Sequence, residues 1–339
     1  MKSEKSTYDQ LSRRLFGHEY YDGGDCVTKY SVGVDLGGTK ILTILWNSEK
    51  RDVVAEHRTP TGAKEGPDAV IGRIVESVRA VADKAGLTVE DVRGIGMGSP
   101  GPLNVKTGIV LCPPNLSGWI NIPLRDRVRQ AFGAPTFLDN DANVAGFAEW
   151  KVGAGQGCAN MLYVTISTGI GGAAIIDNRL QHGETGSATE FGHVMIDPNG
   201  PKCGCGNLGC LEALASGTAI ARDANARLAL RDRVGRQLTA EDVFALFAEG
   251  EPEAVEVVSS AIRYLAIGLA NYIHIYNPRV IVVGGGVADV GEALFAPLRE
   301  QVAKLVFPHL AHSVEIVPAK LGSTAGAVGA ALLVDDIHL

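Results

Sequence analysis

Residues 30–46 read YSVGVDLGGTKILTILW, two runs of apolar and β-branched residues on either side of Gly37 and Gly38. This pattern around a glycine turn predicts a β-hairpin. A second copy follows at residues 159–177, ANMLYVTISTGIGGAAIID, with its own glycine-rich turn. The recurrence indicates a weak internal repeat in which two hairpins present two similar turns.

Strand and helix patterns alternate around these hairpins. Apolar residues recur at helical spacing over residues 67–86, which predicts an amphipathic helix. Residues 181–210, rich in Gly, Cys and polar side chains, predict a long structured loop, and helices dominate from residue 211 onward. This alternation predicts an α/β protein with largely buried sheets. Further helices are expected at residues 125–133, 141–151 and 322–334, and short strands within residues 93–101, 135–139, 279–286 and 313–319.

The composition limits the class of protein. A chain of 339 residues exceeds one ordinary core and predicts two lobes, and 46% hydrophobic with 20% charged residues is typical of a packed globular protein. The net charge of −7, without a basic stripe, argues against nucleic-acid or membrane-surface partners. Charged residues and Pro278 interrupt the most hydrophobic segment, residues 262–286, which predicts a buried helix and strand instead of a membrane span. Without an apolar secretion signal, we expect a cytoplasmic protein.

Each glycine turn carries groups suited to binding an anion. Residues 35–40 combine an acid, two glycines, a hydroxyl and a cation, and residues 167–172 form a second turn of similar composition. Glycines let successive N–H groups converge on a phosphate, and Thr39 and Lys40 add donors. Either turn alone could equally be an ordinary hairpin turn, but the two together favour a cleft that holds a polyphosphate from both sides. The Walker pattern G-x-x-x-x-G-K-[ST] is absent, which excludes a P-loop NTPase.

A cluster of cysteines indicates a metal site. Cys203, Cys205 and Cys210 form a C-x-C-x4-C pattern on a glycine-rich loop, and His193 upstream is a fourth candidate ligand. Three thiolates and one imidazole suit a tetrahedral Zn²⁺, and a filled coordination shell implies a structural site. Three reduced, buried cysteines without metal are the alternative. The G-x-G-x-x-G match at residues 204–209 neither follows a strand nor opens a βαβ unit, so it does not indicate dinucleotide binding.

Polar residues stand where a strand is expected to meet a helix. Residues 139–143 read DNDAN, at the predicted end of a sheet where a ligand would be exposed. An aspartate there could be merely a helix N-cap, and the residue type alone favours that role. Glu212 could simply suit the first turn of a helix, and Glu190 and His193 could share one helical face. Two further segments could each be an ordinary turn, residues 99–102 and 114–116.

Taken as a set, these segments resemble one family. From about residue 30 onward the chain is similar to the ROK family (repressors, open reading frames, kinases), in the glucokinase branch of the actin-like sugar kinases. The resemblance implies a two-lobed actin-like (ribonuclease-H-like) ATPase fold with a central cleft. Residues 30–139 and 324–339 would form a small α/β lobe and residues 140–323 a large α/β lobe with the zinc loop, after an N-terminal extension, residues 1–29. The matching segments are residues 35–40, 99–102, 114–116 with Trp119, 140–141, 167–172, 190–193, 203–210 with Glu212, and 284–286.

The resemblance also implies roles for individual residues. Asp141 matches the base that accepts the proton of the sugar hydroxyl as it attacks the γ-phosphate of ATP, and Asp35 matches a residue that helps to hold Mg²⁺. His193 matches a residue with one ring nitrogen on zinc and the other toward the sugar, and Gly285 matches one that lies against adenosine. The sugar-binding matches are Gly101, Asn115, Asn140, Asp141, Glu190, His193 and Glu212, and the phosphate-binding matches are Gly37, Gly38, Thr39, Lys40, Thr168 and Gly169. The expected cofactors are ATP, Mg²⁺ and a structural Zn²⁺ bound by His193, Cys203, Cys205 and Cys210.

The resemblance leaves the substrate and the assembly open. Residues 114–119 resemble the glucokinase branch, which implies glucose, while fructose, mannose, allose, N-acetylglucosamine and N-acetylmannosamine are alternatives. Inorganic polyphosphate is an alternative phosphoryl donor, and the family implies a homodimer or a tetramer of paired dimers. A sugar-responsive repressor is less favoured, because about thirty non-basic residues precede the first strand, too few for a winged-helix domain. The apolar residues of this extension could pack as a short helix on the lobe or on a neighbouring subunit, or the extension could be disordered: Tyr8, Leu11, Leu15, Phe16, Tyr20 and Tyr21.

Overall fold

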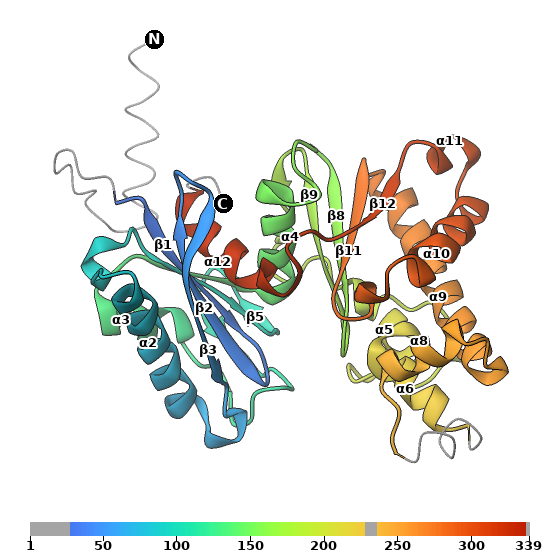
Figure 1. Cartoon of the computed structure of the whole chain (residues 1–339), viewed down its shortest axis with the longest axis horizontal. Helices are drawn as coiled ribbons and strands as arrows, with labels where there is room; N and C mark the ends of the chain where they lie inside the picture. Colours follow the sequence, from blue (N-terminus) through green and yellow to red (C-terminus); the bar gives the residue numbers. More distant parts are fainter. Residues whose placement is uncertain (1–27, 228–235, 337–339) are drawn as a thin grey trace, which may run out of the picture.

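The computed structural model describes residues 28–227 and 236–336, and two five-stranded sheets dominate it (Figure 1). The first sheet has the order β3-β2-β1-β4-β7, with β1 to β3 antiparallel and β4 and β7 parallel to β1. The hairpin predicted at residues 30–46 is confirmed as β1 and β2, whereas the sequence patterns did not predict β3, most of whose side chains are exposed. The strands are β1 (Tyr30–Leu36), β2 (Lys40–Asn47), β3 (Asp52–Pro60), β4 (Ile95–Ser99) and β7 (Thr136–Asn140).

The second sheet repeats this arrangement in the order β10-β9-β8-β11-β12. Strands β8 to β10 are antiparallel, and β11 and β12 continue parallel to β8. The internal repeat indicated by the two glycine turns therefore extends over both sheets. The strands are β8 (Met161–Ile166), β9 (Ile170–Ile176), β10 (Arg179–Leu180), β11 (Val280–Gly284) and β12 (Glu315–Pro318), with a small separate sheet of β5 (Leu103–Asn104) and β6 (Ile109–Val110).

Helices cover the outer face of each sheet. In the first lobe, α2 and α3 bury apolar side chains against β1, β4 and β7. In the second lobe, α9 and α10 pack against the face of β8 and β11 that presents Leu162, Val164, Ile281 and Val283. The helices of the two lobes are α2 (Pro67–Lys84), α3 (Leu124–Phe132), α5 (Leu211–Ala215), α6 (Gly217–Asn225), α8 (Ala240–Ala248), α9 (Pro252–Tyr276), α10 (Glu292–Leu305) and α11 (Pro308–Ala311), with short 3-10 turns at Ala63–Glu65, Val89–Asp91, Phe191–His193, Ala288–Val290 and Gly322–Thr324.

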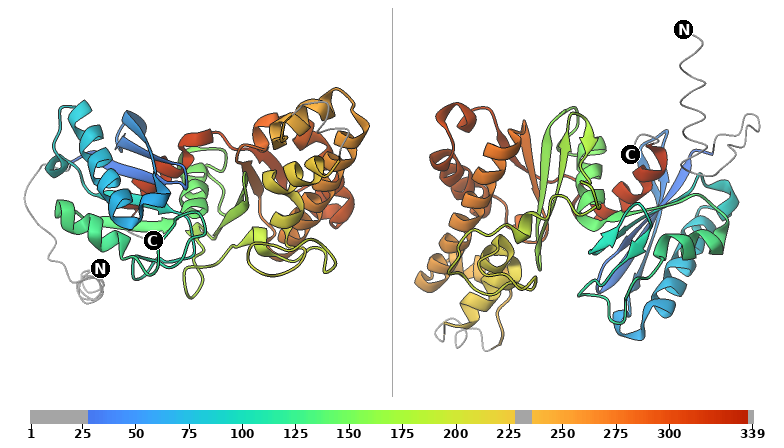
Figure 2. Two further views of the ribbon diagram at one scale, coloured as in Figure 1. Left: turned by 90° about the horizontal axis from the view of Figure 1, so that it is seen from below. Right: turned by 180° about the vertical axis from the view of Figure 1, so that it is seen from behind.

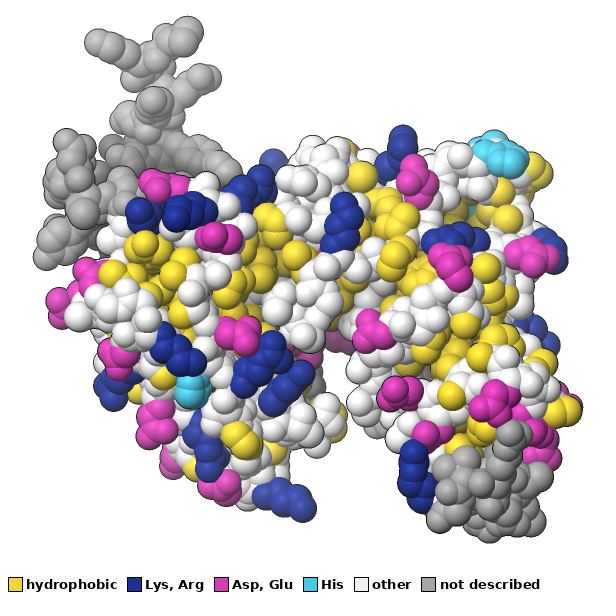
Figure 3. Space-filling view, in the orientation of Figure 1, with side chains coloured by type: hydrophobic (Ala, Val, Ile, Leu, Met, Phe, Trp, Pro, Cys, Tyr) yellow, Lys and Arg dark blue, Asp and Glu magenta, His cyan; other side chains and the backbone are white. Residues whose placement is uncertain are grey.

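Two helices cross between the lobes and lie side by side between the sheets (Figure 2). Helix α4 (Asp141–Val152) follows β7 of the first sheet but packs on β8 and β9, and α12 (Ala325–Asp335) follows β12 of the second sheet but packs on β1 and β4. Glycines permit this close packing, since a Cβ on Gly33 or Gly96 would overlap the backbone of α12. The lobes are joined at these helices, and Figure 3 shows the surface hollowed between them.

Most elements predicted from the sequence are present. The helices expected over residues 67–86, 125–133, 141–151 and 322–334 correspond to α2, α3, α4 and α12, and the four short strands to β4, β7, β11 and β12. Residues 181–210 form a loop whose one helical turn is η3 (Phe191–His193). Among the described helices, none has the length and apolar character needed to cross a membrane. The apolar residues of the N-terminal extension, from Tyr8 to Tyr21, lie outside the described residues.

Candidate active site

The two glycine turns occupy corresponding positions at the ends of the β1–β2 and β8–β9 hairpins. In the first turn, the N–H of Gly37 donates to the carbonyl oxygen of Lys40 at 3.0 Å. In the second turn, the N–H of Ser167 donates to the carbonyl oxygen of Gly169 at 2.8 Å. The side chains of Thr39, Lys40 and Thr168 are exposed, so each turn offers polar groups to a ligand.

A group of carboxyls lies close to the first turn. Asp35 is the penultimate residue of β1, and burial raises its pKa to about 6, although Lys40 acts in the opposite direction. Asp141 is the first residue of α4, and its pKa is raised to about 7 by burial and by the carboxyls of Asp35 and Glu190. Because β1, α4 and the loop after β10 supply these three acids, the structure brings together residues that are distant in the sequence.

The N-cap of α4 is Asn140, so the interpretation of an aspartate as this cap is wrong. The Oδ1 atom of Asn140 accepts hydrogen bonds from the N–H groups of Ala142 at 2.9 Å and Asn143 at 3.4 Å. The Oδ1 atom of Asp141 accepts a hydrogen bond from Ala142 at 2.8 Å.

Four other predicted residues, three of them glycines that a side chain would crowd, lie near the start of α4 or beside one of the glycine turns. Gly101 is beside the side-chain amide of Asn140, because a Cβ built on this glycine would be 3.2 Å from Nδ2. Gly38 of the first turn lies against the exposed Asn115, because a Cβ built on this glycine would be 3.1 Å from the Cβ of Asn115. Gly285 follows β11 with a φ of 86°, packed against the end of β8 at Ile166, where any side chain would overlap the backbone.

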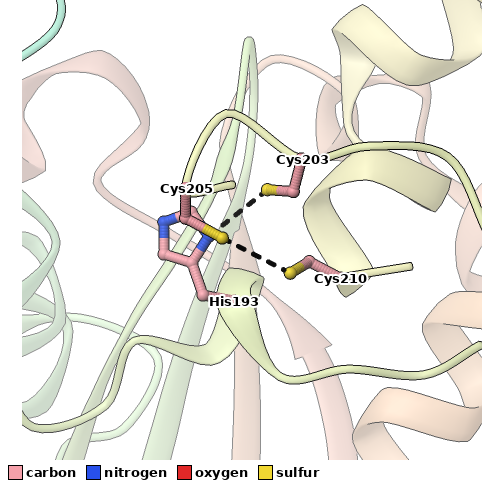
Figure 4. A group of neighbouring side chains, drawn as sticks. All are labelled: His193, Cys203, Cys205 and Cys210. Atoms are coloured by element: carbon pink, nitrogen blue, oxygen red, sulfur yellow. Dashed lines mark hydrogen bonds between the residues drawn. The ribbon is translucent and has the colours of Figure 1, made fainter. Parts of the chain in front are cut away.

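The loop between β10 and α5 brings the four predicted metal ligands together (Figure 4). Their ligand atoms all lie within 4.8 Å of one another, with 3.6 Å between Nδ1 of His193 and Sγ of Cys203, and 3.6 Å between Sγ of Cys205 and Sγ of Cys210. Zn–S bonds of about 2.3 Å in a tetrahedron place two sulfur ligands about 3.8 Å apart. The donor set and its spacing therefore fit a zinc ion.

Glu212 connects this loop to the second glycine turn. It lies in the first turn of α5, as its sequence position suggested, but both of its oxygens have further contacts. The Oε2 atom accepts a hydrogen bond from the N–H of Ile170 at 3.0 Å, and the Oε1 atom lies 3.8 Å from Sγ of Cys203. A metal bound at the cysteines would thus support Glu212, which holds the second glycine turn through Ile170.

The segment that carries Glu190 and His193 is held by contacts that the sequence did not indicate. Thr189 has a φ of 65°, a strained conformation for a β-branched residue, and its Oγ1 donates to the carbonyl oxygen of Gly172 at 3.1 Å. The hydroxyl of Tyr272 in α9 donates to the carbonyl oxygen of Phe191 at 2.5 Å, and the two rings stack. These contacts fix the turn between Glu190 and His193.

His182 and Asp139 form a further contact that sequence patterns did not reveal. The Nε2 atom of His182 lies 2.6 Å from Oδ2 of Asp139. In the sequence, Asp139 directly precedes Asn140 and Asp141. A single histidine in a loop carries no periodicity or spacing signal, so only the folded chain could identify this pair.

Two lobes of repeated topology, each with a glycine turn and joined by crossing helices, define the actin-like ATPase fold, the fold of ROK sugar kinases. The chain belongs to the ROK family, whose family model matches residues 31–337.

Sugar kinases and a repressor align with about nine tenths of the chain. A glucokinase of Thermotoga maritima is 36% identical over 319 residues, which are 90% of this chain and 97% of that protein. The crystal structure of a ROK family glucokinase from Streptomyces griseus in complex with glucose and AMPPNP has 33% identity and a TM-score of 0.78, covering 90% of this chain and 98% of that chain. A xylose repressor of Bacillus subtilis is 30% identical over 310 residues, which are 91% of this chain and 78% of the repressor.

Proposed function

We propose that the chain is an ATP-dependent kinase that transfers a phosphoryl group to the 6-hydroxyl of glucose. The observation that carries this proposal is the carboxyl of Asp141 at the start of α4, whose pKa of about 7 suits proton transfer near neutral pH. The similarity to glucokinases over nearly the full chain supports glucose as acceptor and a nucleotide as donor.

Asp141 would act as the general base. Its ionised carboxylate would accept the proton of the sugar hydroxyl while that oxygen attacks the γ-phosphorus and the bond to ADP breaks. The transfer requires in-line alignment and charge stabilisation more than covalent help, so most of the remaining residues would position the two substrates. The sugar would be held by Gly101, Asn115, Asn140, Glu190, His193 and Glu212, and the nucleotide by Gly37, Gly38, Thr39, Lys40, Thr168, Gly169 and Gly285.

Two metals would complete the site. Asp35, a half-buried carboxyl beside the first turn, fits Mg²⁺, which typically binds one or two carboxylates together with substrate phosphates and neutralises phosphate charge. Zinc at His193 and the three cysteines would hold the loop, and through the ring of His193 and the carboxylate of Glu212 it would support the sugar side of the site.

A second candidate function is a sugar-dependent transcriptional repressor. The similarity to the xylose repressor over most of the chain favours it, and such a protein would bind a sugar without phosphorylating it. Among kinases, the alternatives are another hexose or N-acetylhexosamine as acceptor, and polyphosphate as donor.

The test is ADP formation by the zinc-loaded protein with MgATP and a panel of hexoses and N-acetylhexosamines. We expect turnover with glucose and a loss of about 10²- to 10⁴-fold in Asp141→Asn. Asp68→Asn, an equal change at an exposed residue of α2 that pairs with Arg127, is the matched control and should keep full turnover. Preference for another sugar would correct the substrate alone. Binding of sugar with no turnover from ATP or polyphosphate would favour the repressor.

The expected assembly and location are separate proposals. We expect a homodimer, alone or paired into a tetramer, which light scattering of the purified protein measures. The cytoplasmic location is tested by fractionation of cells that express the chain.

A further inference from the structure

Asp139 is a buried carboxylate with three hydrogen-bond partners from different segments. It is 2% exposed and lies in β7, two residues before Asp141. Its Oδ1 atom accepts from the N–H of Asn140 at 2.6 Å and from Nδ2 of Asn143 at 2.9 Å, while Oδ2 lies 2.6 Å from Nε2 of His182. One carboxylate thus holds the end of β7, the first turn of α4 and the loop after β10.

His182 belongs to the loop that leads to Glu190. Its carbonyl oxygen accepts a hydrogen bond from the N–H of Ala188 at 3.2 Å, which folds the loop back on itself just before Thr189 and Glu190. Gly186 in the same loop lies beside Val105, which connects β5 to β6 in the first lobe. The loop therefore starts in the second sheet and contacts the first lobe at two places.

The charges of this pair agree with its geometry. Burial of the imidazole lowers the pKa of His182, but the hydrogen bond and the charge of Asp139 outweigh burial and raise it. His182 therefore carries a positive charge more readily than an ordinary histidine, opposite a carboxylate. Such an ion pair contributes little net stability, because the cost of desolvating the two groups offsets their attraction. It can instead hold the two segments in one geometry.

We propose that Asp139 and His182 are positioning residues that set the placement of Asp141 relative to Glu190. The side chain of Asp139 orients the strand end that carries Asn140 and Asp141, and the backbone of His182 supports the loop that ends at Glu190. Their contact, the Asp139–His182 bridge, joins these two parts of the site across the two sheets. The kinetic part of this inference rests on the proposed kinase function.

The first experiment compares steady-state kinetics of substitutions at the bridge in the zinc-loaded protein. His182→Ala should lower kcat by about 10- to 100-fold and raise the KM for glucose, because a small misplacement of reacting groups is costly. The KM for ATP should stay within about twofold, since the side-chain hydrogen bonds that the described residues give Asp139 and His182 involve Asn140, Asn143 and each other, none of them in a glycine turn. His182→Arg restores a cation opposite Asp139 and should recover most of kcat, while Asp139→Asn should resemble His182→Ala. His312→Ala, on the exposed connection between α11 and β12, is the control.

The second experiment needs no turnover and therefore separates this inference from the proposed function. Hydrogen exchange should speed up in residues 140–143 and in residues 182–190 together, in His182→Ala and in Asp139→Asn alike. If the unmodified protein phosphorylates no sugar, the proposed function fails and exchange alone decides whether the bridge couples the two segments. Two results would overturn the inference: unchanged exchange at residues 140–143 in His182→Ala, or a loss of activity in all three variants, including His182→Arg, that merely follows the unfolded fraction.

Discussion

Replacing Asp141 by Asn should make the ligand-free protein more stable while it removes activity. The pKa of Asp141 in the folded chain, about 7, lies about three pH units above its ordinary value of 3.8. Between these two values the folded protein keeps a proton that the unfolded chain releases, so its stability falls as the pH rises from about 4 to about 7. Asparagine carries no charge and avoids this loss, and its amide oxygen can still accept the hydrogen bond from Ala142.

The size of the effect follows from the same numbers. Three pH units at about 1.36 kcal/mol each set an upper bound of about 4 kcal/mol above pH 7. Because Asp141 is half-buried and part of its pKa shift comes from the negative charge of Asp35, we expect about half of this bound, about 2 kcal/mol. For a chain of 339 residues that corresponds to a rise of about 3 °C in Tm at pH 8.

The assay is thermal and urea unfolding of both proteins at pH 4 and pH 8, without nucleotide or sugar. The gain should be largest at pH 8 and small at pH 4, where the folded carboxyl is protonated and the unfolded one is about half protonated. Asp68→Asn controls for the general loss of a negative charge and should show no such pH dependence. A gain of equal size at both pH values, or a less stable Asp141→Asn at pH 8, would refute the reasoning.

Three further predictions concern the metal loop, a buried carboxylate and a helix contact. Elemental analysis should find one zinc per chain, and its removal by a chelator should lower the Tm and expose the thiols of Cys203, Cys205 and Cys210; unchanged Tm and thiol reactivity would contradict a structural metal. Glu149 is fully buried, and its carboxylate accepts hydrogen bonds from the backbone N–H groups of Ala154, Lys320 and Leu321. Glu149→Gln places an amide N–H₂ against one of these donors and should lower the free energy of unfolding by about 1–3 kcal/mol. Glu300→Gln, in the exposed pair with Lys304, should have little effect, and urea titrations measure both variants. Gly329→Ala should lower the unfolding free energy by about 1–3 kcal/mol, because its methyl group would overlap the backbone of Val144 in α4. Gly72→Ala, in an open position of α2, should raise the unfolding free energy by up to about 1 kcal/mol. Equal effects of the two substitutions would contradict the packing of α12 on α4.

Local sequence patterns were sufficient to predict the two hairpins, helix α2 and the cluster of metal ligands. The β1–β2 and β8–β9 hairpins follow from apolar runs on either side of glycine turns, and α2 follows from apolar residues at helical spacing. The proximity of Cys203, Cys205 and Cys210 was predictable because the three lie within one short loop, and His193 is only ten residues away from Cys203. Each of these features depends on residues that are near neighbours in the chain.

Other features depend on contacts between distant segments, and the sequence alone did not contain them in readable form. β3 is an edge strand with an exposed face, so its position beside β2 is decided by pairing and not by an apolar pattern. The same holds for the N-cap of α4, where Asn and Asp are equally suitable residue types and only the observed hydrogen bonds show that Asn140 has the role.

The amino-acid sequence by itself determined the α/β class, the two glycine turns, the metal-ligand cluster and the resemblance to one family, because each is written in local composition and spacing. The tertiary structure alone decided the crossing of α4 and α12, the gathering of Asp35, Asp141 and Glu190, and the contact of Asp139 with His182. The physical reason is that burial and the pKa values that it shifts arise only when segments far apart in the chain exclude water from one another.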